Sequence, residues 1–102
     1  MDLERLKLLR DTAKRGKYAP LHDFLVQRFL LQHTQKEWKT TFGEIEGILG
    51  FELPKSARIH RPWWANQQGV GGGHSHALAW EMAGWHTAQV NLADETLVFR
   101  RE

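Results

Sequence analysis

The stretch TFGEIEGILG, residues 41–50, decides the fold because it carries signals for both ends of a short helix. Thr41 and Glu44 form a capping box, in which the threonine hydroxyl accepts a hydrogen bond from a first-turn N–H while the glutamate reaches back. Gly50 supplies the left-handed residue that commonly ends a helix. The apolar residues between these signals share one face and predict the buried side of the helix: Phe42, Ile45, Ile48 and Leu49.

Two helices and a short strand are predicted before this stretch. Residues 37–40 alternate in character and indicate a strand. Pro20 suits the first turn of a helix, since its missing N–H needs no partner there, and this helix is expected to end near His33. Residues 2–14 form the earliest helix, which stops at Gly16 and carries an apolar stripe: Leu3, Leu6 and Leu9.

A short helix, a loop, a further helix and a hairpin are predicted after residue 50. Residues 55–61 form one or two helical turns before Pro62, which disfavours helix at the preceding residue. The segment NQQGVGGG, residues 66–73, is a loop, and Ser75 caps a helix over residues 76–83 that ends at Gly84. Two strands follow, 86–92 and 96–101, with a turn at 93–95; the residues expected to face inward are His86, Ala88, Val90, Leu92, Leu97 and Phe99.

From residue 18 onward the order is helix, strand, helix, helix, strand, strand, which is that of a winged helix-turn-helix domain. We therefore expect an α+β, winged-helix-like domain over residues 18–102, with residues 1–17 as a helical appendage. Residues 76–83 would be the recognition helix and the hairpin the wing. The connection from Gly50 to Ser75 is long for this fold, so it carries an insert, or residues 54–61 are the third helix. The leucine stripe of the appendage would pack on the domain or on a second copy, giving a homodimer.

Size and composition favour one cytoplasmic domain. A chain of 102 residues, with 41% hydrophobic and 25% charged residues, can bury one core. No cysteine is present, which excludes disulfides, thiolate catalysis and cysteine-bound zinc. The longest apolar run, residues 77–80, is too short to span a membrane.

The main functional signal is a stretch of 28 residues without Asp or Glu, from Leu53 to Trp80. It contains three Lys or Arg, three His and three Trp, whereas acids outnumber bases by 12 to 11 in the rest of the chain. Cations interleaved with aromatic rings suit a polyanion that presents stackable bases. We therefore expect the stretch to bind DNA or RNA.

Each residue type in the acid-free stretch suggests a contact. Cationic side chains would meet phosphates, and amide side chains pair bidentately with adenine. A base would stack on the exposed member of the tryptophan pair, since adjacent residues of a regular element cannot both face one core. The expected nucleic-acid-binding residues are Lys55, Arg58, His60, Arg61, Trp63, Trp64, Asn66, Gln67, Gln68, His74 and His76.

The same residues are also compatible with a structural role, a protein partner or a metal. One tryptophan would fill the core while the other lies on a helix with its N–H satisfied, and the basic turn would pair with nearby glutamates. A protein-binding module or inhibitor, such as a phage-like accessory or anti-defence protein, would use the tryptophan pair and the glycine loop. A metal-dependent nuclease would use His74 and His76, with His60 or His86 as a third ligand.

No cofactor, metal or catalytic residue is expected. No Ser, His and Asp set has a readable spacing. The glycine run at residues 71–73 lacks the Lys-Ser/Thr pair of a phosphate-binding loop. The sequence is therefore not that of a recognisable enzyme, and nucleic-acid binding is the leading interpretation.

Several short pieces form a pattern whose most distinctive part is Trp63-Trp64-Ala65-Asn66. The others include YAPL (18–21), TFGEIE (41–46), AW (79–80) and AGW (83–85). With these pieces, residues 18–101 resemble a family of small bacterial, archaeal and phage proteins that carry a domain of unknown function. The resemblance implies a compact domain and transfers no activity. The first helix and residues 69–73 depart from the usual pattern of that family.

Overall fold

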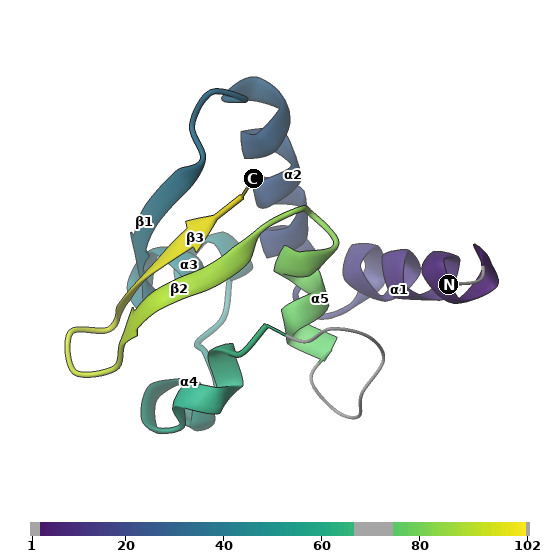
Figure 1. The fold of residues 1–102 in the computed structure, drawn as a ribbon. Helices are drawn as coiled ribbons and strands as arrows, with labels where there is room; N and C mark the ends of the chain where they lie inside the picture. Colours follow the sequence, from purple (N-terminus) through teal and green to yellow (C-terminus); the bar gives the residue numbers. More distant parts are fainter. Residues whose placement is uncertain (1–2, 67–74, 102) are drawn as a thin grey trace.

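The computed structural model describes residues 3–66 and 75–101, which form a mixed α+β fold, as the sequence predicts (Figure 1). The helices are α1 (Leu3–Arg15), α2 (Ala19–Leu31), α3 (Phe42–Leu49), α4 (Lys55–Ile59), the 3₁₀ helix η1 (Arg61–Trp64) and α5 (Ser75–Glu81). The strands are β1 (Glu37–Thr41), β2 (His86–Asn91) and β3 (Thr96–Arg100).

The strands form one antiparallel sheet in the order β1-β3-β2, so the last strand of the chain lies in the middle. Phe99 of β3 lies opposite Trp38 on one side and Thr87 on the other. Helices α2 and α5 cover one face of this sheet. The ring centroid of Phe24 in α2 is 4.8 Å from that of Trp38, and the ring of Trp80 in α5 is 5.8 Å from that of Phe99.

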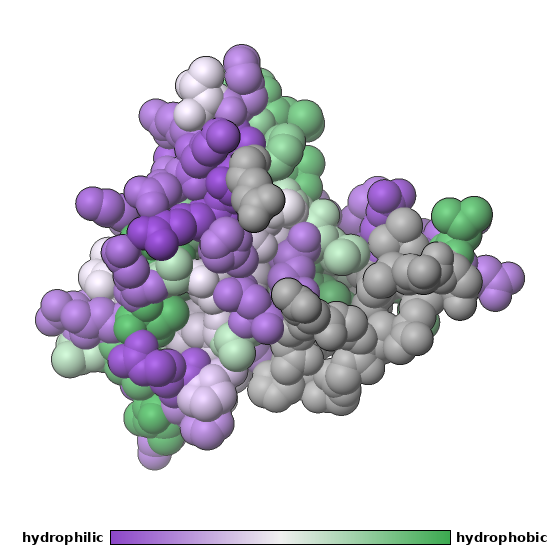
Figure 2. Space-filling model, viewed as in Figure 1, coloured by the Kyte–Doolittle hydropathy of each residue, from purple (hydrophilic) through white to green (hydrophobic). Residues whose placement is uncertain are grey.

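The opposite face of the sheet is mainly polar, with Val98 of β3 as a buried apolar residue on it. Burial alternates along β1, so that Glu37, Lys39 and Thr41 are exposed while the residues between them are buried. This is the period of two expected when one face of a strand meets a core and the other meets water. The side of the molecule formed by the strands is accordingly mainly hydrophilic in Figure 2.

The signals at residues 41–50 act as predicted. The Thr41 hydroxyl accepts a hydrogen bond from the Glu44 N–H over 3.0 Å, and Gly50 has a φ of 84°, in the left-handed region. Phe42 and Ile45 are completely buried. Local sequence therefore fixes both ends of α3, and its apolar face anchors it in the core.

A β-bulge corrects the predicted face of β2. Ala88 pairs with Val98, but Asn91 pairs with Thr96, so β2 has one extra residue between these pairs. Gln89 lies there with a φ of 49°. Because one inserted residue reverses the alternation of side chains, Thr87 is the buried residue before the bulge, whereas His86, predicted to face inward, is exposed.

Helix α1 extends away from the rest of the fold and contacts α5 and α2 near its C-terminal end (Figure 1). Ala13 is buried on that side. Leu3, predicted to belong to a packed stripe, is 77% exposed because it lies at the outer end of the helix. The side chains of Leu6 and Leu9 lie outside the described part of the structure. In the described ranges, no helix combines the length and apolar character that crossing a bilayer requires.

Candidate nucleic-acid interface

The acid-free stretch folds into α4, η1 and the start of α5, and much of it lies in the core. Trp63 and Trp64 are 8% and 1% exposed, so the prediction that one of them is exposed is wrong. Both rings lie near Trp80, but each also has a partner of its own: Trp64 stacks on Phe42 at 4.9 Å, whereas Trp63 lies parallel to His76 at 3.9 Å. The prediction assumed a single core face, but α3 and α5 enclose η1 from two sides. The Trp64 indole N–H is satisfied by the Ala57 carbonyl at 2.8 Å.

His76, one of the expected nucleic-acid contacts, is buried as well. Its Nε2 lies 2.6 Å from the carbonyl oxygen of Trp63. A carbonyl can only accept, so Nε2 carries the proton and donates it in this bond. His76 therefore joins the start of α5 to η1 and is not presented to a phosphate.

Arg58 is engaged by two carboxylates. Its guanidinium donates to both carboxylate oxygens of Glu46, at 3.0 and 3.1 Å, and to Glu95 at 3.0 Å. The hydrogen bonds from Arg58 lower the pKa of Glu46, and in return Glu46 raises the pKa of Arg58. The alternative of a basic turn paired with nearby glutamates thus describes Arg58. The guanidinium ties α4 to α3 and to the turn before β3.

The Asn66 amide is bonded within the fold. Its Oδ1 accepts from the Thr87 N–H at 2.9 Å and from the Trp80 indole N–H at 3.1 Å. Its Nδ2 donates to the Thr87 carbonyl at 3.1 Å. A second side chain, Arg61, donates to the Val90 carbonyl. Together these groups cover the outer edge of β2, which would otherwise be open to another strand.

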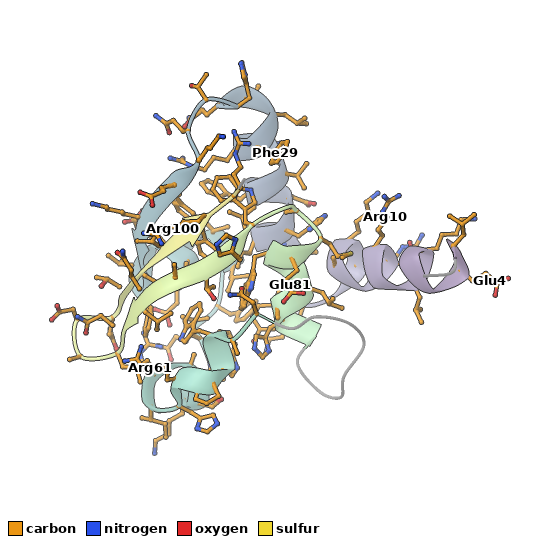
Figure 3. The ribbon with its side chains drawn as sticks, viewed as in Figure 1. Glu4, Arg10, Phe29, Arg61, Glu81 and Arg100 are labelled. Carbon is orange, nitrogen blue, oxygen red and sulfur yellow. The ribbon has the colours of Figure 1, made fainter. Side chains whose placement is uncertain are left out.

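Several residues of the stretch are exposed, and we call four of them the α4–η1 surface: Lys55, Ile59, His60 and Arg61. Within the described part of the chain, Lys55 and His60 make no side-chain hydrogen bond or ion pair. Figure 3 shows Arg61 next to the β2–β3 hairpin, where a hollow of about 420 Å³ separates η1 from β2. The predicted contact residues Gln67, Gln68 and His74 lie outside the described residues.

Helix α5, expected to be the recognition helix, presents no exposed residue between positions 76 and 83. Helices α1 and α2 both contact it, and Trp80 is completely buried. A helix that enters a groove must direct side chains into that groove. The reading surface expected at α5 is therefore not available there. The second assignment suggested by the sequence, residues 54–61, has an exposed face.

A second basic segment lies outside the stretch that the sequence singled out. Residues 1–17 contain six Lys or Arg and three Asp or Glu, a net charge of +3, which equals that of the acid-free stretch with its three cations. Lys7, Arg10 and Lys14 are exposed and follow one another at helical spacings of three and four residues. Figure 3 shows Arg10 directed away from the domain. A count of charge in short windows would have found this segment.

The described histidines and carboxylates do not gather into a metal site. Among residues 3–66 and 75–101, no group of three or more His, Asp or Glu is close enough to hold an ion. His76, one of the ligands considered for a nuclease, donates to a carbonyl in the core. His74 lies outside the described residues.

Comparison with known proteins places the chain in a family. A family model with the description "domain of unknown function (DUF7662)" matches residues 18–102, and the chain belongs to this family. Searches of curated proteins and of solved structures gave no significant match. The match begins at Tyr18, so α1 lies outside the region that the family shares.

Proposed function

We propose that this member of the DUF7662 family binds nucleic acid through the α4–η1 surface, as a winged-helix-like domain in which α4 is the reading helix. The observation that carries the proposal is the joint exposure of Lys55, His60 and Arg61 on a segment without acidic residues. Helix α4 follows α3 after residues 50–54, which is where a helix-turn-helix places its second helix. The β2–β3 hairpin would serve as the wing.

Arg58 supports this surface indirectly. Through its bonds to Glu46 and Glu95, it offsets half of the negative charge of two carboxylates on the elements that flank α4. A phosphate that approaches Lys55 or Arg61 therefore meets less repulsion than the sequence composition of α3 and the hairpin would suggest. The same bonds hold the hairpin turn to α4, which fixes the wing relative to the reading helix.

The hollow between η1 and β2 adds a place for a base or a sugar. Arg61 and Pro62 line one side, and residues 87–90 line the other. Gln89 of the bulge is exposed, and its amide offers both a donor and an acceptor to a base edge. A cation beside an apolar wall and an amide is a combination that suits single-stranded or unpaired bases.

Fluorescence anisotropy with labelled single- and double-stranded oligonucleotides tests the proposal. Lys55→Ala and Arg61→Ala should each weaken binding to all sequences and reduce the slope of log affinity against log salt by about one unit. Lys36→Ala is the matched control. It removes the same charge from an exposed residue beside the Glu37–Arg100 end of the sheet, whereas the hairpin lies at the Thr41–Thr96 end.

Two results would overturn the proposal. The first is a parent protein that shows no binding at low salt. The second is a Lys36→Ala variant that reduces the salt slope as much as Arg61→Ala does. The second result would mean that general basic charge, and not the α4–η1 surface, attracts the oligonucleotide.

A protein partner is the second candidate, and Ile59 favours it. This residue is 67% exposed and lies between the cations of the α4–η1 surface. The burial of both tryptophans removes the aromatic anchor that the sequence suggested for such a partner. Binding through Ile59 would depend weakly on salt, and Ile59→Ala would weaken it more than Lys55→Ala. The salt dependence therefore separates the two candidates.

A further inference from the structure

The two edges of the sheet differ in whether their outward backbone groups are hydrogen-bonded. Asn66 and Arg61 bond the outer edge of β2, but β1 forms the opposite edge. Two backbone bonds fix which groups of β1 face outward: the Arg101 N–H donates to the Lys36 carbonyl at 2.9 Å, and the Phe42 N–H donates to the Glu95 carbonyl at 2.9 Å.

Hydrogen-bonded and non-bonded pairs alternate along an antiparallel ladder. The backbone N–H and C=O groups of the even-numbered residues of β1 therefore point towards β3. The backbone N–H and C=O groups of Glu37 and Lys39 then point away from the sheet. Within residues 3–66 and 75–101, no group bonds them from that side. Strand β1 is therefore an open edge with two pairs of hydrogen-bonding groups.

A flank of apolar side chains and one guanidinium adjoins this edge on the core side. The Phe24 ring of α2 lies 4.8 Å from the Trp38 ring between centroids, and the Arg28 guanidinium carbon lies 5.3 Å from the Trp38 centroid. Leu31 lies seven residues after Phe24, on the same stripe of the helix, and is 78% exposed. A strand added to β1 would thus gain apolar contacts as well as backbone bonds.

The charges on β1 select a second copy of this chain as the added strand. We propose that β1 pairs antiparallel with β1 of a second copy, with Glu37 opposite Lys39 of the partner subunit. The two-fold axis then passes beside Trp38, and both outward-facing pairs become hydrogen-bonded pairs. Opposite charges face each other twice on the solvent side of the sheet, which stabilises the pairing.

Other arrangements lack this match. If Lys39 lay opposite the partner subunit's Lys39, like charges would meet at the centre of the interface. A lysine on an edge strand usually discourages pairing. Here Glu37 lies two residues before Lys39, so the lysine favours the one antiparallel register in which each Lys39 lies opposite a Glu37. The resulting interface is small, so the dimer forms with a dependence on concentration.

Sedimentation velocity over a range of concentrations tests the proposal with charge-reversal variants. The parent should move from the 11.9 kDa mass of one chain towards that of two. Glu37→Lys and Lys39→Glu should each remain at the mass of one chain, because each places like charges opposite one another. An equimolar mixture of the two variants should recover the two-chain mass, since opposite charges then face each other again across the interface.

Matched variants separate pairing from folding. Glu37→Lys also loses the Glu37–Arg100 ion pair of 2.5 Å, so Arg100→Ala is the control that loses this pair and keeps both edge charges. Arg100→Ala should dimerise as the parent does. Lys39→Pro removes an outward N–H without removing a bond to β3, and it should abolish the dimer. Circular dichroism and thermal melts confirm that each variant is folded.

Three outcomes would overturn the proposal. The first is a parent protein that keeps the mass of one chain at all concentrations. The second is dimerisation of the charge-reversal variants as strong as that of the parent, and the third is a mixture of the two variants that does not recover the dimer. If Leu3→Asp dissociated the parent dimer while Glu37→Lys did not, the two copies would meet through α1.

Discussion

At the scale of single residues, Asn66 illustrates why the acid-free stretch is ambiguous in sequence. An asparagine amide that can pair with adenine can equally pair with the N–H and C=O of one strand residue. Here it bonds both backbone groups of Thr87 and the indole N–H of Trp80. Whether the amide bonds a base or the backbone depends on β2 lying beside residue 66. Asn66 and Thr87 are about twenty positions apart in the chain, so local sequence does not reveal that they meet.

Trp63 gives a residue-scale prediction that differs from the sequence interpretation. Because the ring is buried against His76, Trp63→Ala should lower the free energy of unfolding by about 3–5 kcal/mol. Trp63→Phe keeps most of the apolar volume and should lower it less. Urea denaturation measures both changes. Trp63 is instead a stacking residue for bases if Trp63→Ala keeps the parent's stability and loses oligonucleotide affinity.

At the scale of elements, substitutions of three glycines distinguish the cost of backbone strain from the cost of steric contact in the free energy of unfolding. Gly47 in α3 is exposed with open space around it, so Gly47→Ala should raise the free energy of unfolding by about 0.5–1 kcal/mol. Gly50 has a φ of 84° with open space, so Gly50→Ala should lower it by about 1–2 kcal/mol. Gly84 has a φ of 88°, and a Cβ there would lie 3.3 Å from the Phe29 ring. Gly84→Ala should therefore be the most destabilising of the three.

Thermal melts and urea denaturation of the three variants measure this order. Equal effects of Gly50→Ala and Gly84→Ala would show that the Phe29 ring moves aside without loss. A destabilising Gly47→Ala would show that α3 makes contacts that the present packing does not include.

The elements that the sequence predicts well are those fixed by local signals. The capping box at Thr41 and the glycine stop at Gly50 need only neighbouring residues, and α3 follows them. The bulge at Gln89 depends on how β2 pairs with β3, which residue periodicity does not reveal. The candidate site was predicted less well, because burial of η1 depends on α3 and α5 meeting around it. Of the predicted contact residues that are described, Lys55, His60, Arg61 and Asn66 are exposed, and the amide of Asn66 is engaged within the fold.

At the scale of the whole molecule, positive charge is concentrated in two segments whose exposed cations lie on different elements. Lys7, Arg10 and Lys14 are on α1, whereas Lys55 is on α4 and Arg61 is on η1. Residues 1–17 and 53–80 each carry a net charge of +3, so the other residues together are negative enough to leave +2 overall. Helix α1 projects from one end of the fold, and α4 lies towards the other, below the sheet (Figure 1). A long polyanion can meet both segments, whereas a short one meets a single segment.

The ion pairs of Arg58 connect α3, α4 and the hairpin, and they give the folded protein a pH dependence. The pKa of Glu46 lies below its ordinary value of about 4.5 because Arg58 donates hydrogen bonds to the carboxylate. The folded state therefore favours the ionised form. The contribution of this carboxylate to the free energy of unfolding is complete when the pH is above the ordinary pKa. It is lost as the pH falls through the lowered pKa of Glu46 in the folded state.

Glu46→Gln should accordingly be less stable than the parent at neutral pH, and the difference should shrink in acid. Urea denaturation at a series of pH values measures this. Glu52→Gln is the matched control, because Glu52 is exposed and its side chain has no partner in the described part of the chain. A difference between Glu46→Gln and the parent that stays constant from neutral to acid pH would contradict the assignment.

The burial of the aromatic residues determines which optical signals the protein can provide. All five tryptophans are at most 8% exposed, and the rings of Trp63 and Trp64 are only 4.7 Å apart. Intrinsic emission should therefore be blue-shifted in the folded state and shift strongly to the red on unfolding. Closely spaced indoles should also couple and give a distinctive near-ultraviolet dichroism. Trp64 lines the hollow between η1 and β2, so a base held there would lie against this ring. A change in native tryptophan emission without the red shift of unfolding would therefore report that the hollow is occupied.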